Sequence, residues 1–348
     1  MLLFFNTVHL CENYSHIEEI EMLNLHRRII SSNNSMFYDR SETVVSPVRV
    51  ENKFKIPNLN SSFDLSYEEV CDITAKNFLD TGKKLRVMWS GGIDSTLILV
   101  SLFKLGITDQ LEIALNIDSI SENQEFYYNH ILGKFKIIPS TDIKSLFSKD
   151  HILIGGEYND QLLGSNLLPL FSKYYDTDEL FKKLSRDKIY KIFSSKLENK
   201  KIVDRWIDIY LKTIQGSPVP IETNLDFHWW INFCCKWQGL YFRLASYTDL
   251  KTDLDNYHHF FQNDLFQQWS LINHNQKFYD WKDYKRICKE IIYRYDKNKN
   301  YLDNKIKSES LTFMAQKNGF YNFIDSQQHR HFELPENCFQ ESQDFKLP

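Results

Sequence analysis

A short stretch of the chain, "LRVMWSGGIDSTLILVSLFKLG" at residues 85–106, places small and hydroxyl residues between two apolar blocks. Glycines in such a position let backbone amides approach a ligand closely, because no Cβ stands in the way. The neighbouring hydroxyls and the start of the following helix add further donors, which together favour an anion. The residues predicted to bind it are Ser90, Gly91, Gly92, Asp94, Ser95 and Thr96.

Asp94 adds a requirement to this site, since a carboxylate repels a phosphate unless a cation bridges them. We therefore expect Mg²⁺ beside Asp94. The alternative is a plain turn in which Asp94 or Ser95 caps the helix. The stretch has neither G-x-x-x-x-G-K-[ST] nor G-x-G-x-x-G, which argues against a P-loop or dinucleotide-binding protein.

A second stretch, "HILIGGEYNDQLLGS" at 151–165, also runs from an apolar segment through glycines to acidic residues. Gly155 and Gly156 again allow close backbone approach, and Asp160 supplies a second carboxylate. Residue types alone favour a simpler interpretation, in which Glu157 and Asp160 only complement the dipole of a helix in its first turn.

Parallel strands must position these two loops. Apolar runs predict strands at 85–89, 111–117, 135–139 and 151–155. Helices are expected between them, and capping boxes are predicted at Ser66/Glu69 and Ser121/Gln124. If the strand order is 3-2-1-4, the loops after strands one and four are neighbours. Asp94 and Asp160 would then share one Mg²⁺.

Outside these strands the sequence has other patterns. Residues 1–65 alternate short apolar pieces with Asn/Ser-rich turns. From about 175 amphipathic helices follow one another, including those predicted at 178–197, from 258 and at 281–295. We predict an α/β fold: a small β/irregular extension at 1–65, a doubly wound parallel-sheet domain at 66–175 and a helical lobe at 176–348.

Composition excludes several classes of protein. The 348 residues are 42% apolar with a net charge of -4, so a globular protein is expected and nucleic acid is not the expected main partner. Six cysteines without a C-x-x-C pair indicate reduced, buried thiols in the cytoplasm rather than a zinc site. No apolar stretch reaches membrane-spanning length, and no membrane partner is expected.

"SGGIDS" at residues 90–95 resembles the S-G-G-x-D-S pyrophosphate loop of the N-type ATP pyrophosphatases, which include asparagine synthetase, GMP synthetase and NAD synthetase. The resemblance implies an adenine nucleotide alpha hydrolase-like fold with ATP and Mg²⁺. In that family the loop grips the β and γ phosphates while a nucleophile attacks the α phosphorus, which releases pyrophosphate and leaves an adenylate.

The stretch at 151–165 resembles the G-E-x-x-D-[EQ]-L-x-G segment of the asparagine synthetase synthetase domain. By this resemblance Asp160 is the second metal ligand, and Glu157 handles the amine nucleophile. Family members commonly have Glu where this chain has Gln161, and a small residue where it has Tyr158. These departures bear on the identity of the acceptor more than on the ATP chemistry.

A weaker third match lies in "NKIKSESL" at 304–311, which resembles a basic R-x-K element. Lys307 would be the catalytic lysine that reaches the α phosphate, and Lys305 would stand for the arginine. Such a charge stabilises the phosphorus transition state. The alternative is a solvated Lys/Asn-rich turn, and the residues leave both open.

The resemblance predicts an AMP-forming carbon–nitrogen ligase. A small-molecule or peptide acceptor would present a carboxylate, or an amide or urea oxygen, for adenylation, and ammonia or an amine would then displace AMP. Two alternatives stay open: a related enzyme that modifies tRNA or a nucleobase, and a non-catalytic nucleotide-binding protein. The missing cysteine pair and the acidic balance argue against the first.

The nitrogen donor is expected to arrive free. Glutamine-dependent members of the family carry an N-terminal glutaminase with a terminal cysteine, whereas this chain has Leu2 and its first cysteine is Cys11. Residues 1–65 are too few for such a domain. Ammonia or the amino group of a second substrate is therefore the predicted nucleophile.

Overall fold

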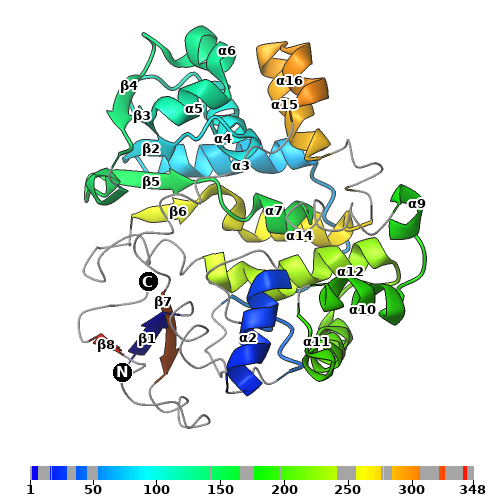
Figure 1. The fold of residues 1–348 in the computed structure, drawn as a ribbon. Helices are drawn as coiled ribbons and strands as arrows, with labels where there is room; N and C mark the ends of the chain where they lie inside the picture. The colour runs from blue at the N-terminus through cyan, green and yellow to red at the C-terminus, as the bar shows by residue number, and fades with distance from the viewer. Residues whose placement is uncertain are drawn as a thin grey trace.

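The computed structural model contains a five-stranded sheet, seen in the upper left part of Figure 1. The structure describes residues 2–6, 16, 18–29, 37–44, 54–141, 143–164, 176–195, 197–240, 256–275, 277, 284–305, 321–325 and 340–342. Its strands are β2 (Lys84–Met88), β3 (Leu111–Leu115), β4 (Lys136–Pro139), β5 (His151–Gly155) and β6 (Tyr257–His259). All neighbouring strands are parallel, in the order β4-β3-β2-β5-β6. The fold is therefore of the α/β class.

Four of these strands are predicted by the sequence, and each lies within two residues of its predicted bounds. They follow the order 3-2-1-4 on which the predicted meeting of the two loops depends. Strand β6 was not expected, because the sequence predicts a helix from 258, whereas α14 (Asp264–Ile272) starts later. Three residues are too few to show strand alternation, and pairing with β5 decides their conformation.

Helix α4 (Ile93–Phe103) follows β2 and is buried along almost its whole length. It packs against α3 (Tyr67–Asp80) and against α15 (Arg286–Asp296), which comes from much later in the chain. Figure 1 shows α15 (orange) beside the cyan and blue helices of the sheet. A helix this apolar needs neighbours on every side. The C-terminal part of the chain supplies one of them.

The N-termini of helices α3 and α5 can be compared with the two predicted capping boxes. The box before α3 is confirmed, with Ser66 as its first residue. The box predicted at Ser121 and Gln124 is wrong, because α5 (Ile117–Glu122) begins earlier, at a box whose first residue is Asn116. The remaining elements here are α6 (Gln124–Phe126), η1 (Tyr127–Ile131), η2 (Ile143–Leu146), α7 (Asn159–Leu163) and α16 (Lys299–Asn304).

The described residues between β5 and β6 are mostly helical. Besides α7, their helices are α9 (Thr177–Leu180), α10 (Arg186–Ser194), α11 (Lys200–Thr213), η3 (Ile214–Gly216), α12 (Asn224–Trp230) and η4 (Ile231–Lys236), with η5 (Phe260–Gln262) just after β6. The single helix predicted at 178–197 is wrong. Ser185 caps α10, and the Leu184 amide donates to Glu222 O at 2.8 Å, so local and long-range hydrogen bonds break the helix there.

The N-terminal segment contains more than the expected strands and loops. Strand β1 (Leu2–Asn6) does pair with β7 (Tyr321–Asp325) and β8 (Gln340–Ser342), in a separate antiparallel sheet. The segment also forms helix α2 (Glu18–Ile29), which packs on α11. Buried Arg40 donates to Phe233 O at 2.8 Å and to Phe54 O at 2.6 Å. These contacts tie the segment to the helices.

No helix in the described part of the chain combines the length and apolar character needed to cross a bilayer. The cysteines within the described residues are free and buried, as expected: Cys71, Cys234, Cys235 and Cys288. Cys11 and Cys338 lie outside the described residues.

Candidate nucleotide site at the carboxyl edge of the sheet

The loop between β2 and α4 holds the first predicted site residues. Gly92 caps α4 without a side-chain hydrogen bond, so the alternative in which Asp94 or Ser95 is an ordinary N-cap is wrong. Gly91 has a φ of 74°, and a Cβ added there would overlap the carbonyl oxygen of Ser119. Both the backbone conformation and the close approach of Ser119 therefore require glycine at this position.

Hydroxyl groups hold this loop in shape. The Ser90 amide donates to Ser95 Oγ at 3.1 Å, and the Gly92 amide donates to Ser90 Oγ at 3.3 Å. Thr96 is fully buried, and its hydroxyl accepts a hydrogen bond from Trp89 Nε1 at 3.1 Å. Ser90 and Ser95 thus shape the loop itself, whereas Thr96 anchors it to the core.

The loop after β5 lies directly against the first loop. A Cβ added to Gly156 would lie 3.4 Å from Asp94 Cβ and 3.5 Å from the Ser95 nitrogen. Gly155, the last residue of β5, faces the Tyr257 hydroxyl of β6 instead. Neighbouring parallel strands bring the two loops to one edge, where α/β folds bind ligands.

Lys285 joins the two predicted metal ligands. Its Nζ lies 2.7 Å from Asp160 Oδ1 and also contacts Asp94 Oδ2. The lysine side chain is 2% exposed, whereas Asp94 and Asp160 keep 26% and 21% of their side-chain surface exposed. The Tyr284 hydroxyl donates to the same oxygen of Asp160 at 3.5 Å. Asp94 and Asp160 thus lie together, as the strand order predicts, with an ammonium group between them.

Burial and the neighbouring charges shift the pKa values of Lys285 and Asp94. Burial alone would lower the pKa of Lys285, but the carboxylates of Asp160 and Asp94 outweigh it and hold that pKa well above its usual range. Burial raises the pKa of Asp94, and the Lys285 ammonium opposes this shift. The lysine is therefore charged at neutral pH.

Asn159 holds Asp94 in place, and two more side chains contact Asn159. Asn159 is fully buried and donates from Nδ2 to Asp94 Oδ1 at 2.6 Å. The Tyr67 hydroxyl donates to the Asn159 side-chain oxygen, and the Asn159 amide lies 3.4 Å from Cys288 Sγ. Burial raises the pKa of the Cys288 thiol to about 12, so it stays protonated and is no nucleophile.

Other predicted residues have different placements. Glu157 is half-buried in the second loop, directly after Gly156. Lys305 follows α16 and forms an ion pair with Glu122. The Glu122 Cβ would lie 2.7 Å from a Cβ on Gly91, so Lys305 is held near the first loop. Lys307 lies outside the described residues.

The residues present fit Mg²⁺ poorly in this conformation. Mg²⁺ needs several oxygen ligands around it in octahedral geometry. No cluster of three or more potential metal-binding side chains occurs within the ranges that the structure describes. Two carboxylates are available, and the Lys285 ammonium lies between them. A cation-binding position is present, but a lysine fills it.

Sequence reasoning missed Lys285, Tyr284 and Asn159 as parts of this site. The segment at 281–295 is predicted only as an amphipathic helix, and α15 does form most of it. Lys285 precedes α15 with a φ of 49°, in the left-handed region that non-glycine residues rarely adopt. No local pattern marks such a residue, although Asn159, next to Asp160, was within reach of the second motif.

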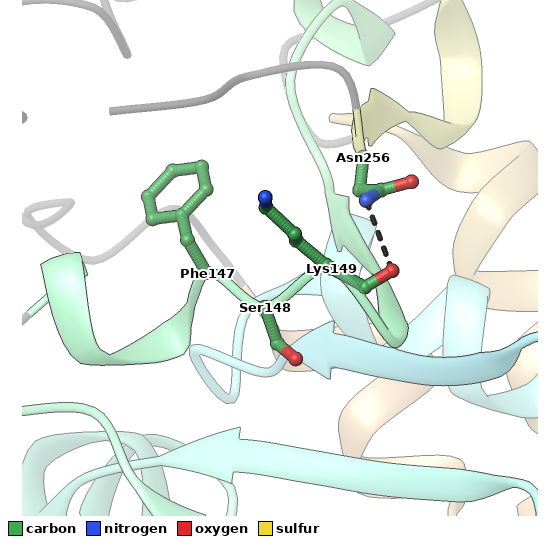
Figure 2. Close-up of a pocket in the computed structure, with 4 residues that line it drawn as sticks. All are labelled: Phe147, Ser148, Lys149 and Asn256. Atoms are coloured by element: carbon green, nitrogen blue, oxygen red, sulfur yellow. Dashed lines mark hydrogen bonds between the residues drawn. The ribbon is translucent and has the colours of Figure 1, made fainter. Parts of the chain in front are cut away.

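A small open hollow lies elsewhere on the molecule (Figure 2). Phe147, Ser148, Lys149 and Asn256 line it, and the Asn256 side chain donates to the Lys149 carbonyl at 3.3 Å. These residues precede β5 and β6, so the hollow lies at the amino edge of the parallel sheet. It is at the opposite end from the two glycine loops and contains no residue predicted for the site.

Comparison with protein-family models, curated proteins and solved structures finds no match for this chain. Its function must therefore be inferred from the residues and their geometry.

Proposed function

We propose that the chain is an AMP-forming ligase that resembles asparagine synthetase and uses ATP to activate a carboxylate-bearing acceptor. The observation that carries this proposal is the contact between the two glycine loops, which places Asp94, Asp160 and Lys285 beside the N-terminus of α4. Backbone amides and a helix N-terminus at the carboxyl edge of a parallel sheet are suited to binding phosphates.

In this proposal the chain's own residues bind and orient the reactants. Ser90, Gly91 and Gly92 hold the β and γ phosphates. An acceptor oxygen forms a bond to the α phosphorus as the bond to the bridging oxygen breaks, and pyrophosphate leaves. Lys305 offers a positive charge close to the first loop, which would stabilise charge on the phosphates.

The second half-reaction joins the acyl group to ammonia or an amine. The amine attacks the adenylate's carbonyl carbon, AMP leaves, and Glu157 orients the amine and takes its proton. The acceptor is a small molecule or a peptide. Mg²⁺ is expected to accompany ATP, but while Lys285 lies between Asp94 and Asp160 no chemical step is assigned to the metal.

The finer architecture belongs to the same proposal. We propose a doubly wound sheet of the adenine nucleotide alpha hydrolase type, with a helical lobe completing the site. The packing of α15 on α4 supports this, since it brings Lys285 from the C-terminal part of the chain to the two loops.

A substrate screen tests the proposal. The purified chain is incubated with ATP, Mg²⁺, labelled pyrophosphate and a panel of carboxylates, and exchange of label into ATP is measured. We expect exchange that depends on one class of carboxylate, with AMP and pyrophosphate as products once an amine is added. Primary release of ADP and phosphate with a competent acceptor would disprove cleavage between the α and β phosphates.

A non-catalytic nucleotide-binding protein is the second candidate. It is favoured by Lys285, which already contacts one oxygen of each carboxylate and offsets part of their charge. Tight binding of ATP with no exchange for any carboxylate or amine would support this alternative over the ligase.

A further inference from the structure

Lys285 lies where a divalent cation would bind between Asp94 and Asp160. We infer that Lys285 is a built-in cation that closes this acidic pair to divalent metals in the nucleotide-free chain. The pair then becomes available only when the lysine moves away.

Competition for the same oxygens supports this inference. The Lys285 ammonium contacts one oxygen of each carboxylate and is almost completely buried. A metal bound to those oxygens would lie within a few ångströms of the ammonium, and like charges so close repel strongly away from bulk water. Occupation by the lysine and by a divalent cation is therefore mutually exclusive.

The position of Lys285 is imposed by its surroundings. Its backbone has φ 49° and ψ 39°, which a residue with a side chain rarely adopts. The following helix, α15, is held against α4, and Cys288 in its first turn lies 3.4 Å from the same Asn159 amide that donates to Asp94. The surrounding packing therefore holds Lys285 in an uncommon backbone conformation beside the two carboxylates.

The step that opens the site rests on the proposed function. A bound triphosphate would bring several negative charges to the N-terminus of α4 and attract the Lys285 ammonium. As the lysine turns from the carboxylates to the phosphates, the oxygens of Asp94 and Asp160 that it contacted would become accessible to a metal that arrives with the nucleotide. The closed state of the free chain does not depend on this step.

Mn²⁺ binding to the nucleotide-free chain tests the closed state. Free Mn²⁺ is measured by its electron paramagnetic resonance signal during titration of wild type, K285M, K285R and K104M. Lys104 is the control, since its Nζ also contacts two carboxylates, Glu68 at 2.9 Å and Asp72 at 2.6 Å, but with 29% of its side chain exposed. Glu68 also pairs with Arg294 at 2.6 Å, so the control is titrated both as K104M and as K104M/R294M.

We expect wild type, K285R, K104M and K104M/R294M to leave Mn²⁺ free, and K285M to bind one ion at least about tenfold more tightly. The K285M/D160N variant should lose that ion. Equal Mn²⁺ affinity of wild type and K285M would overturn the inference, as would an equal gain in K104M or K104M/R294M, because any carboxylate pair would then suffice.

Two more measurements keep the inference testable if K285M misfolds and separate it from the proposed function. Wild type alone is titrated with Mn²⁺ with and without a non-hydrolysable ATP analogue: tight Mn²⁺ binding without nucleotide contradicts the inference even if K285M does not fold. If K285M gains the ion but wild type binds no ATP analogue, the proposed function fails and the closed acidic pair stands.

Discussion

The two ends of helix α4 carry the same chemical group in different surroundings. At the N-terminal end, Lys285 joins Asp94 and Asp160 and is 2% exposed. At the C-terminal end, Lys104 joins Glu68 and Asp72 and is 29% exposed. A lysine paired with two acids therefore does not by itself mark a functional site, because its burial differs between the two clusters.

Solvent accounts for the difference between the two clusters. The Lys104 side chain is itself 29% exposed, so water competes with its ion pairs and their net contribution is small. Lys285 is cut off from water at 2% exposure, and removing it leaves Asp94 and Asp160, which are partly exposed, without their cation. The exposed cluster fastens α3 to α4, whereas the buried one fixes the charge of a candidate site.

The largest effect should come from the acids at the N-terminal end. D94N and D160N are each expected to lower ATP-dependent product formation by at least about 100-fold, because the site loses a carboxylate that would hold the cation bound to the phosphates. D72N serves as the control at the other end and should retain activity. Release of AMP and pyrophosphate is the measurement. Near-normal turnover of D160N would remove the functional distinction between the two ends.

Stability should separate the two lysines next. K285M is expected to lower the free energy of unfolding by about 2 kcal/mol, since it removes a buried cation from two partly exposed carboxylates. K104M should cost about 0–1 kcal/mol at the exposed cluster. Urea unfolding at neutral pH, followed by circular dichroism, compares the two variants. Equal losses would show that burial does not distinguish the clusters.

Two glycines extend the comparison to the backbone. Gly91 and Gly106 have φ values of 74° and 71°, but a Cβ on Gly91 would overlap Ser119 whereas Gly106 has nothing within 4 Å. G106A should therefore cost only the strain of the left-handed conformation, about 1 kcal/mol. G91A should cost more and also weaken nucleotide binding. Thermal unfolding and binding of an ATP analogue are measured, and equal behaviour of the two variants would contradict the close contact.

The smallest effect concerns pH at the exposed end. Burial opposes the shift, but hydrogen bonding to Lys104 holds the pKa of Glu68 below its usual range. This contribution is present above the unfolded pKa of about 4.3 and is lost as pH falls through the lower folded value. E68Q should therefore lower the Tm by no more than about 2 °C at pH 7, and the difference should shrink as pH falls through the lowered folded pKa and vanish below it. A difference that does not shrink in acid would assign the effect to packing.

Local sequence patterns determined the sheet and the two loops. The sequence predicted that Asp94 and Asp160 lie together. This prediction rested on apolar runs of about five residues, on glycines at the strand ends and on the known geometry of parallel sheets. The need for glycine at position 91 could also be predicted, because it depends on the backbone conformation of that residue. Ser121 was misread as a cap because Asn116, an equally good capping residue, begins the helix first.

Tertiary packing alone decided what lies between the two acids. Lys285 reaches them because α15 returns from the far end of the chain to cover α4, and no pattern within a few residues of position 285 encodes that meeting. The same holds for β6, whose three residues become a strand only beside β5. Short segments and single charges take their roles from neighbours distant in sequence, since burial and pairing energies depend on the whole fold.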